Sequence, residues 1–396
     1  MAPSLPPDPS GRLSTGRVLG EKFEILGVLG EGGTGVVYDA VRLEQKDRIA
    51  LKVIHSSLLG DKQIRGRFTR EAAILRRLHG PHLSAILDFG ELPDPKHVNA
   101  GLLYIALPKI EGIALDRLLK DEGPLGIDRA IDIVLQICDA LKSAHAQGVI
   151  HRDLKPPNVI LDGGSHVMVV DFGMAKIVTG GGTGTTELTA HNMVFGTPEY
   201  MAPEQARGDE LDARCDIYAT GIMLYELLTG RVPFSGHTPL NVLTAQLTMA
   251  PTPPRERAPE RKISPALEAV VMHAIAKDPG ERYATAEALG TAIQHAQSMP
   301  EDVLGVRPGT YRIDVGEARD EDLDAHGPTL PAPVPTYPPS RNAPREGGAT
   351  RREMPSTIPP SRPSQAPMGS RGWALVWVIA ALVSISFGVW LSLRSK

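Results

Sequence analysis

The feature that most constrains this chain is a dense polar loop held between two short apolar runs. The runs are Val149-Ile150 and Val159-Ile160-Leu161, and because apolar runs are buried in folded proteins, both ends of the loop are fixed. The loop presents a carboxylate at Asp153, an ammonium at Lys155 and a carboxamide at Asn158. A carboxylate can take or orient a hydroxyl proton, an ammonium can neutralise phosphate, and an amide oxygen can bind a hard cation. Phosphoryl transfer needs these groups, since its catalysis is mostly positioning and charge stabilisation.

A glycine-rich turn supplies a second candidate phosphate-binding element. Residues 23–41 predict a strand, a tight turn and a second strand, and Gly30, Gly32 and Gly35 give the turn the spacing G-x-G-x-x-G. Glycine lets backbone amides approach phosphate oxygens closely. A dinucleotide-binding loop has the same spacing but continues into a helix, whereas here a β-rich run begins at Val36-Val37.

A lysine inside an apolar strand is the next candidate. Lys52 lies within the strand expected at 49–54, where a lysine needs a buried partner. Residues 65–79 predict an amphipathic helix, and Glu71 lies beside its apolar stripe, so it can face the sheet and supply that partner. The alternatives are a surface lysine and a solvated glutamate.

The remaining pattern divides into a β-rich first part and a helical second part. Strands are expected at 86–90 and 102–107, residues 108–112 break the pattern and link two lobes, and a long helix at 127–147 leads into the polar loop. Further helices are expected at 216–229, 239–249, 266–275 and 285–297.

A carboxylate at a strand end precedes the least regular part of this region. The strand expected at 167–170 ends at Asp171, which is followed by Phe172-Gly173. From 174 to 201 the chain is rich in glycine and threonine, and we expect a mobile loop.

The two ends of the chain differ from its middle in composition. Residues 1–19 are rich in Pro, Ser and Gly without an apolar core, which predicts a disordered lead-in and no signal peptide. Residues 298–372 are first acidic and then Pro-rich, which predicts a disordered linker. The net charge of −4 gives no basic field for nucleic acid. The two cysteines, Cys138 and Cys215, fit small core residues in a reducing compartment.

An uncharged run of 21 residues at 373–393 predicts a transmembrane helix. At about 1.5 Å per residue it spans about 30 Å, the thickness of the bilayer hydrocarbon. Trp373 and Trp390 lie near its ends, where interfacial aromatic residues are common. A buried C-terminal helix is the alternative, but the Pro-rich approach gives it no core to join. Only the short tail 394–396 follows, so we expect no extracellular sensor.

Taken in order, these motifs resemble a protein kinase, and specifically the eukaryotic-like (Hanks-type) serine/threonine kinases of bacteria. The resemblance covers about residues 20–297 and implies an α+β, two-lobe protein-kinase fold, with an N-lobe at about 20–107 and a C-lobe at about 112–297. The motifs that carry it are Gly30-x-Gly32-x-x-Gly35-x-Val37, Ala50-Leu51-Lys52, Glu71, His151-Arg152-Asp153-Leu154-Lys155-Pro156-Pro157-Asn158, Asp171-Phe172-Gly173, Ala202-Pro203-Glu204, Asp216 and Arg282.

The resemblance implies catalytic roles that agree with the chemistry of the residues. Lys52 would hold the α- and β-phosphates of ATP and pair with Glu71, Asp153 would orient the substrate hydroxyl, and Lys155 would steady the transferred phosphoryl group. The lysine at 155 points to Ser and Thr as acceptors. Glu204 and Arg282 would form a structural ion pair in the large lobe.

The cofactors implied are ATP and Mg²⁺, with Mn²⁺ as a possible substitute. Asn158 and Asp171 would bind the metal. The hinge departs from the family pattern at Pro108-Lys109, so hinge contacts with the adenine should come mostly from the backbone. The positions implied to contact ATP are Leu29, Gly30, Glu31, Gly32, Gly33, Thr34, Gly35, Val37, Ala50, Lys52, Ile110 and Ile160.

The resemblance also implies an activation switch. Arg152 would dock a phosphate on the activation loop, where Thr189 is the first candidate for phosphorylation and Thr185 and Thr186 are the next. Thr197 is similar to the threonine that bonds the catalytic aspartate. We expect autophosphorylation in trans through a transient homodimer. The alternative is that the loop threonines only keep a Gly-rich segment soluble.

Two functional hypotheses remain open at this point. The first is an active kinase that phosphorylates Ser and Thr of protein substrates, held by the lipid bilayer of the cell membrane through a single span, with its kinase domain in the cytoplasm where ATP is found. The second is a pseudokinase that binds nucleotide as a scaffold. Such proteins usually lack the lysine, the catalytic aspartate or the metal-binding aspartate, and all three are present here as Lys52, Asp153 and Asp171.

Overall fold

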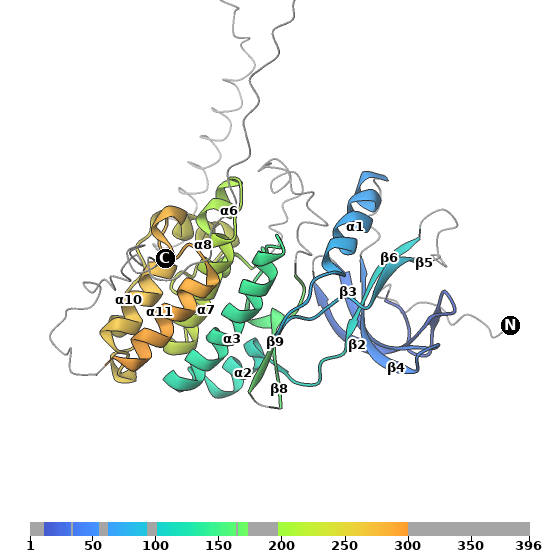
Figure 1. The fold of residues 1–396 in the computed structure, drawn as a ribbon, viewed down its shortest axis with the longest axis horizontal. Coiled ribbons are helices and arrows are strands. Elements are labelled where there is room, and N and C mark those ends of the chain that lie inside the picture. Colours follow the sequence, from blue (N-terminus) through green and yellow to red (C-terminus); the bar gives the residue numbers. More distant parts are fainter. Residues whose placement is uncertain are drawn as a thin grey trace, which may run out of the picture. The chain divides into compact units, whose positions relative to one another are not determined.

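The structure is a computed structural model that describes residues 12–32, 35–54, 62–92, 101–163, 165–172 and 197–299, without the side chains of 62–64. These residues form a β-rich lobe with one helix and a larger helical lobe (Figure 1). Several expectations from the sequence lie outside the described residues, namely those for 1–11, Gly33, Thr34, Gly173, Thr185, Thr186, Thr189, the linker from 300 onward and the run at 373–393. Within the described ranges, no helix is both long and apolar enough to cross a bilayer.

The small lobe is built on a six-stranded antiparallel sheet in the order β1-β2-β3-β4-β6-β5. One face of it is apolar, with Ile25, Ile49 and Leu51 at 0 % exposure, and Phe23 packs edge-on against Tyr104 at 5.0 Å between ring centroids. The strands are β1 (Val18–Leu19), β2 (Phe23–Gly32), β3 (Gly35–Arg42), β4 (Asp47–Ile54), β5 (Asp88–Leu92) and β6 (Leu102–Pro108).

Helix α1 (Lys62–Leu75) is the helix of the small lobe and the element that carries Glu71. Phe68, Ala72 and Leu75 are buried on one stripe, as the sequence pattern predicts. Phe68 packs edge-on against Phe89 of β5, which places the helix against the sheet.

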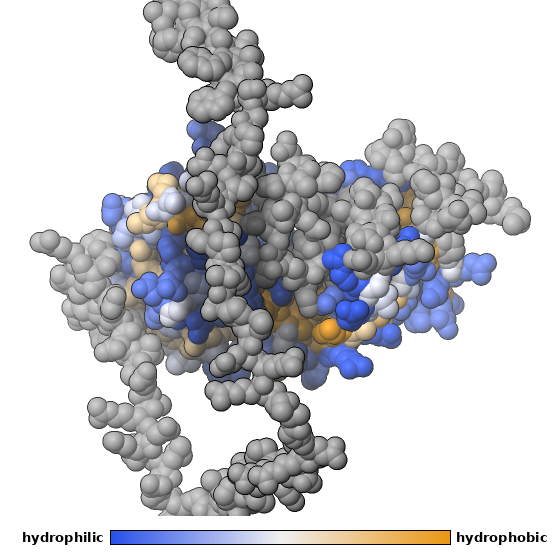
Figure 2. All heavy atoms as spheres, turned by 90° about the horizontal axis from the view of Figure 1, so that it is seen from above, coloured by the Kyte–Doolittle hydropathy of each residue, from blue (hydrophilic) through white to orange (hydrophobic). Residues whose placement is uncertain are grey.

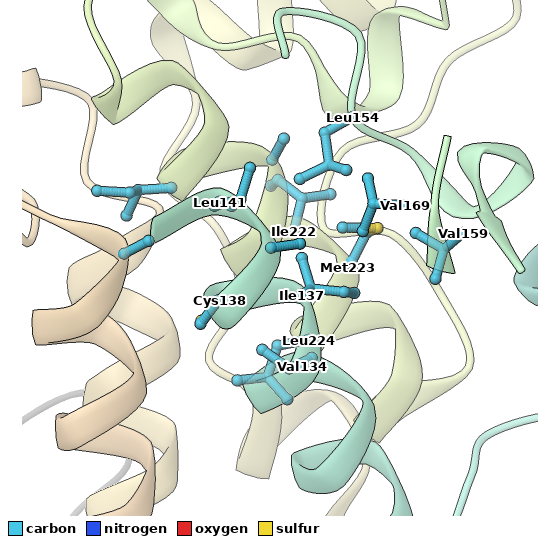
Figure 3. Packing of buried hydrophobic residues seen from close by; sticks show 14 of the residues in the cluster. Val134, Ile137, Cys138, Leu141, Leu154, Val159, Val169, Ile222, Met223 and Leu224 are labelled. Atoms are coloured by element: carbon cyan, nitrogen blue, oxygen red, sulfur yellow. The ribbon is translucent and has the colours of Figure 1, made fainter. Parts of the chain in front are cut away.

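The large lobe is organised around two central helices, α3 (Ile127–Ala146) and α7 (Arg214–Thr229). Helix α7 is apolar on nearly all sides and almost wholly buried, so it forms the centre of the lobe. Figure 3 shows side chains of α3 packing toward α7 and toward the small sheet of this lobe. The other helices are α2 (Leu115–Glu122), α6 (Pro203–Arg207), α8 (Pro239–Thr248), α9 (Pro254–Arg257), α10 (Pro265–Ala274) and α11 (Ala286–Ser298), with 3-10 turns at η2 (Pro156–Asn158), η3 (Pro198–Tyr200), η4 (Pro259–Arg261) and η5 (Pro279–Glu281).

A three-stranded sheet in the order β7-β8-β9 frames the polar loop. Its strands are β7 (Ile113–Ala114), β8 (Val159–Asp162) and β9 (His166–Val169), and it lies between the helices of the large lobe and the small lobe (Figure 1). The loop after α1 pairs with this sheet, since Ser84 donates its backbone N–H to the Val169 carbonyl at 3.1 Å and Val169 donates to the His82 carbonyl at 2.8 Å. The segment that leads to Asp171 is therefore attached to both lobes.

Polar side chains cover much of the visible surface of the described residues, with apolar areas between them (Figure 2). Among the described residues, the most exposed large apolar side chains are Leu240 at 70 %, near the start of α8, and Met249 at 58 %, directly after its end.

Candidate active site

The buried carboxylate of Asp216, on α7, fixes the backbone of the polar loop through hydrogen bonds. It accepts hydrogen bonds from the backbone N–H groups of His151 (2.8 Å) and Arg152 (2.9 Å), and from the His145 ring at 2.8 Å. Burial raises the pKa of Asp216, but the hydrogen bonds and charges of His145 and His151 outweigh it, so the pKa is lowered overall. Because Arg152 has a left-handed backbone with φ of 67°, this ionised anchor supports a turn that a non-glycine residue does not favour.

The His151 side chain links the loop to the segment that carries Asp171. Its Nε2 lies 2.9 Å from the carbonyl of Val170, which can only accept, so Nε2 carries the hydrogen. Nδ1 then accepts the backbone N–H of Asp153 at 3.3 Å, and the ring packs on Phe172 at 4.6 Å between centroids. The fully buried His151 ring therefore fixes the backbone at Asp153 and at Val170.

Asp153 and Lys155 form the partly exposed face of the loop, where the sequence predicts catalytic groups. Lys155 Nζ donates to both carboxylate oxygens of Asp153, at 3.0 and 2.8 Å. Between them Leu154 is buried at 3 % exposure and points into the core with Val159 and Val169 (Figure 3). Because Leu154 points inward while Asp153 and Lys155 point outward, the Asp153 side chain stays 36 % exposed. A hydroxyl can therefore reach its carboxylate while the backbone stays fixed.

Asn158 is oriented for cation binding by a hydrogen bond of its own. Its Nδ2 donates to the Asp153 carbonyl at 2.8 Å, and the residue is 7 % exposed. Because the amide nitrogen is engaged, the side-chain oxygen is the group left to act as a metal ligand, which is the donor type that Mg²⁺ prefers.

Lys52 and Asp171 bring the two lobes together at the site. Lys52 is buried on β4 at 5 % exposure, and its Nζ lies 2.6 Å from Asp171 Oδ2. Asp171 has a left-handed backbone with φ of 63°, directly after the β9 segment held by both lobes. The expected buried partner of Lys52 therefore exists, but it is Asp171. Glu71 is half-buried on α1 and has contacts of its own, and the described residues show no ion pair between it and Lys52.

The glycine-rich segment covers the end of β2 and the start of β3, which pair antiparallel as the sequence predicts. A side chain at Gly35 would meet the Val53 carbonyl oxygen at 2.2 Å, so this position requires glycine. Leu29 and Glu31 are exposed on β2, and Glu31 forms an ion pair with Arg12 of the preceding segment.

Four of the apolar positions expected to contact ATP lie on four different elements. Val37 is on β3, Ala50 on β4, Ile110 on the link between lobes and Ile160 on β8, and each is half-buried. Next to Ile110, Lys109 forms ion pairs with Asp39 of β3 at 3.3 Å and with Glu111 at 3.1 Å. The hinge departure therefore has a structural role, since Lys109 ties the link to the sheet of the small lobe.

The predicted Glu204–Arg282 ion pair is confirmed. Arg282 donates from Nη1 and Nη2 to the two carboxylate oxygens of Glu204, at 2.6 and 2.7 Å, and both residues are buried. Thr197 differs from expectation, because in the described residues the Asp153 carboxylate is bonded by Lys155 and no hydrogen bond joins it to the Thr197 side chain.

Two contacts of the segment after Thr197 were not foreseen from the sequence. Gln205 donates to the Arg152 carbonyl at 2.8 Å and accepts the Ala202 N–H at 3.0 Å, so it bridges this segment to the polar loop. Tyr200 donates to the Glu226 carboxylate of α7 at 2.5 Å. The position of Gln205 directly after Ala202-Pro203-Glu204 was the available signal.

Comparison with known proteins places this site in a family. The protein kinase domain family matches residues 23–293, which is more than half of the chain. The chain therefore belongs to the protein kinase family, and its two-lobe fold and the order of its site residues agree with that membership.

Its relatives are bacterial serine/threonine-protein kinases. The chain is 41 % identical over 283 residues to serine/threonine-protein kinase pkn3 of Myxococcus xanthus, covering 70 % of this chain and 50 % of pkn3. It is 38 % identical over 275 residues to PknB of Mycobacterium tuberculosis, covering 69 % and 42 %. The chain thus spans about half the length of the curated relatives it matches. A crystal structure of the M. tuberculosis PknI kinase domain is similar at a TM-score of 0.57 and 25 % identity, covering 73 % of this chain and all of that one.

Proposed function

We propose that this chain is an ATP-dependent serine/threonine protein kinase. The observation that carries the proposal is the arrangement of the site: Asp153 accessible and held by Lys155, with Lys52 and Asp171 meeting from the two lobes. The names of the relatives, which are Ser/Thr kinases, support the acceptor type.

The residues present fit the cofactors that this family uses. Asn158 and Asp171 offer an amide oxygen and a carboxylate, and Lys52 offers a buried ammonium, which are ligand types for Mg²⁺ and for phosphate. Bound Mg²⁺–ATP would supply the phosphoryl group with its charge neutralised. Lys52 would have to exchange its contact with Asp171 for phosphate oxygens and for Glu71.

The chain's own residues provide the positioning. Asp153 accepts a hydrogen bond from the acceptor hydroxyl and orients its oxygen, and Lys155, which contacts the same carboxylate, places a positive charge where the transferred group passes. The His151 and Asp216 contacts keep this geometry fixed without reorganisation during the reaction.

Transfer of radiolabelled phosphate from ATP in the presence of Mg²⁺ or Mn²⁺ tests the proposal. Wild-type protein should label itself or an added Ser/Thr acceptor, and Asp153→Asn should not. The pseudokinase alternative predicts nucleotide binding without labelling in either protein.

We further propose that the kinase acts from the cytoplasmic side of the cell membrane, anchored by residues 373–393, and that it activates itself by phosphorylation in trans. The uncharged 21-residue run supports the anchor, and the position of Arg152 beside Asp153, together with the loop threonines, supports the switch.

A further inference from the structure

Gln246 of α8 is a fully buried polar residue whose side chain forms hydrogen bonds with η3 and α7. Its Nε2 donates to the backbone carbonyls of Pro198 (3.2 Å) and Glu199 (2.6 Å), both in η3. Its Oε1 accepts a hydrogen bond from the hydroxyl of Tyr218 on α7. Burial raises the pKa of Tyr218 well above its usual value, so this hydroxyl keeps its proton and remains a donor.

The backbone that Gln246 holds belongs to the segment that contacts the catalytic loop. The segment that follows η3 is joined to the Arg152 carbonyl through Gln205, one residue before Asp153. On the other side, Tyr200 is held by Glu226. A protein substrate whose hydroxyl reaches Asp153 extends about 3.3–3.6 Å per residue in each direction, so its flanking residues pass over the elements beside Asp153. The segment 198–205, which begins with η3, is one of these elements, because its Gln205 contacts the Arg152 carbonyl.

The burial of Gln246 indicates that this support is specific. An unpaired amide in the interior is costly, and at 0 % exposure an apolar residue would serve packing alone better. Instead all three polar contacts are made with two other elements. The backbone of Gln246 is fixed too, because Lys277 Nζ donates to its carbonyl at 2.7 Å while lying 3.8 Å from the centre of the Phe234 ring.

We infer that Gln246 is a positioning residue for the protein substrate: it fixes the η3 backbone so that the substrate segment next to the acceptor hydroxyl meets a preformed surface. The inference rests on the proposed kinase function. It assigns Gln246 no contact with ATP or with the transferred group, and it therefore predicts an effect on substrate binding that is separate from nucleotide binding.

The test is the steady-state kinetics of the full chain with a synthetic Ser/Thr acceptor peptide. Gln246→Leu, which removes both donors and the acceptor, should raise the KM for the peptide about tenfold, because losing a buried network of this size is worth about 1.4 kcal/mol. The KM for ATP and kcat should change less than about twofold on the same reasoning, since no contact with either reacting group is lost. Tyr218→Phe, which removes one of the three bonds, should raise the peptide KM by a smaller factor.

A matched control separates this role from general destabilisation. Gln136 of α3 also donates to two carbonyls, those of Ser165 (2.8 Å) and Asp132 (3.4 Å), and accepts the N–H of Val167 (2.9 Å), but it lies at the β8–β9 hairpin. Gln136→Leu should lower Tm without changing the peptide KM.

A peptide KM in Gln246→Leu no higher than in Gln136→Leu, or an equal rise in the KM for ATP, would overturn the inference. Should Gln246→Leu not fold, an unchanged peptide KM in folded Tyr218→Phe overturns it. Absence of transfer in wild type would instead count against the kinase proposal.

Discussion

Lys52 and Asp171 carry opposite charges 2.6 Å apart in a largely buried site, so each is placed by the other. We predict that Lys52→Met and Asp171→Asn each lower phosphoryl transfer by at least about 10²-fold, because one removes a charge that binds phosphate and the other weakens the metal site. Transfer from radiolabelled ATP measures the loss, and circular dichroism checks that the fold is retained. Wild-type turnover in either variant would contradict the site assignment.

The buried Glu204–Arg282 pair predicts a stability effect rather than a chemical one. Glu204→Gln removes the carboxylate from an Arg282 side chain that is 0 % exposed, and leaving such a charge unpaired costs about 3–5 kcal/mol. The free energy of unfolding in urea measures it. The control is Glu287→Gln, which breaks the exposed Lys142–Glu287 pair and should cost less than about 1 kcal/mol. Equal losses in the two variants would show that burial of the first pair adds nothing.

At the scale of elements, the junction of α7 with the polar loop predicts that the stability of the folded protein depends on pH. The pKa of Asp216 is lowered in the folded protein below the usual value of an aspartate, so in the acid range the folded state binds fewer protons than the unfolded state. The stabilisation is therefore complete above about pH 4 and is lost as pH falls through the lower, folded-state pKa. Asp216→Asn should lower the stability at pH 7 and flatten this acid limb. Thermal unfolding from pH 7 to pH 2 measures both, and an unchanged acid limb would exclude Asp216 as its source.

The elements were more predictable from sequence than the contacts between them. The strands around Gly30 and Lys52, helix α3 and the buried α7 follow from hydrophobic period and glycine placement, which are local signals. The partner of Lys52 was expected to be Glu71, on the following helix, whereas it is Asp171, 119 residues away. The contacts of Gln205 and Gln246 were not predicted either, because they are long-range. The sequence does not show which glutamine will be buried beside backbone carbonyls.

The threonines expected in the activation loop predict that phosphorylation of this one segment switches the kinase activity. A phosphate adds about −1.5 to −2 charges and can order a loop against a cation such as Arg152. We predict that Thr189→Ala combined with Thr185→Ala and Thr186→Ala lowers activity toward an added substrate severalfold, and that Arg152→Ala makes the activity independent of loop phosphorylation.

Mass spectrometry of active protein identifies the phosphorylated threonines, and a phosphatase-treated sample serves as the control for the switch. Full activity in the triple variant would exclude it and leave the kinase assignment intact.

Over the whole molecule, the two lobes are linked by contacts that converge on the site. The chain link at 109–112, the pairing of Ser84 with β9 and the Lys52–Asp171 ion pair each join the small lobe to the large one. Motion of one lobe against the other would therefore change the distance between Lys52 and Asp171.

Membrane attachment is the remaining prediction at this scale. The uncharged run at 373–393 is long enough to span a bilayer and is separated from the last described residue, Met299, by more than 70 residues of acidic and Pro-rich sequence. Such a tether would confine kinase domains to one surface and raise their local concentration for phosphorylation in trans.

We predict that deleting 373–396 releases the protein from the membrane pellet into the soluble fraction. Phosphoryl transfer to a saturating peptide should be retained, while autophosphorylation should become dependent on protein concentration. A Lys52→Met chain with an intact C-terminus is the control, since it should remain in the pellet without activity. Recovery of the truncated protein in the pellet after a high-salt wash would show that this run is not the anchor.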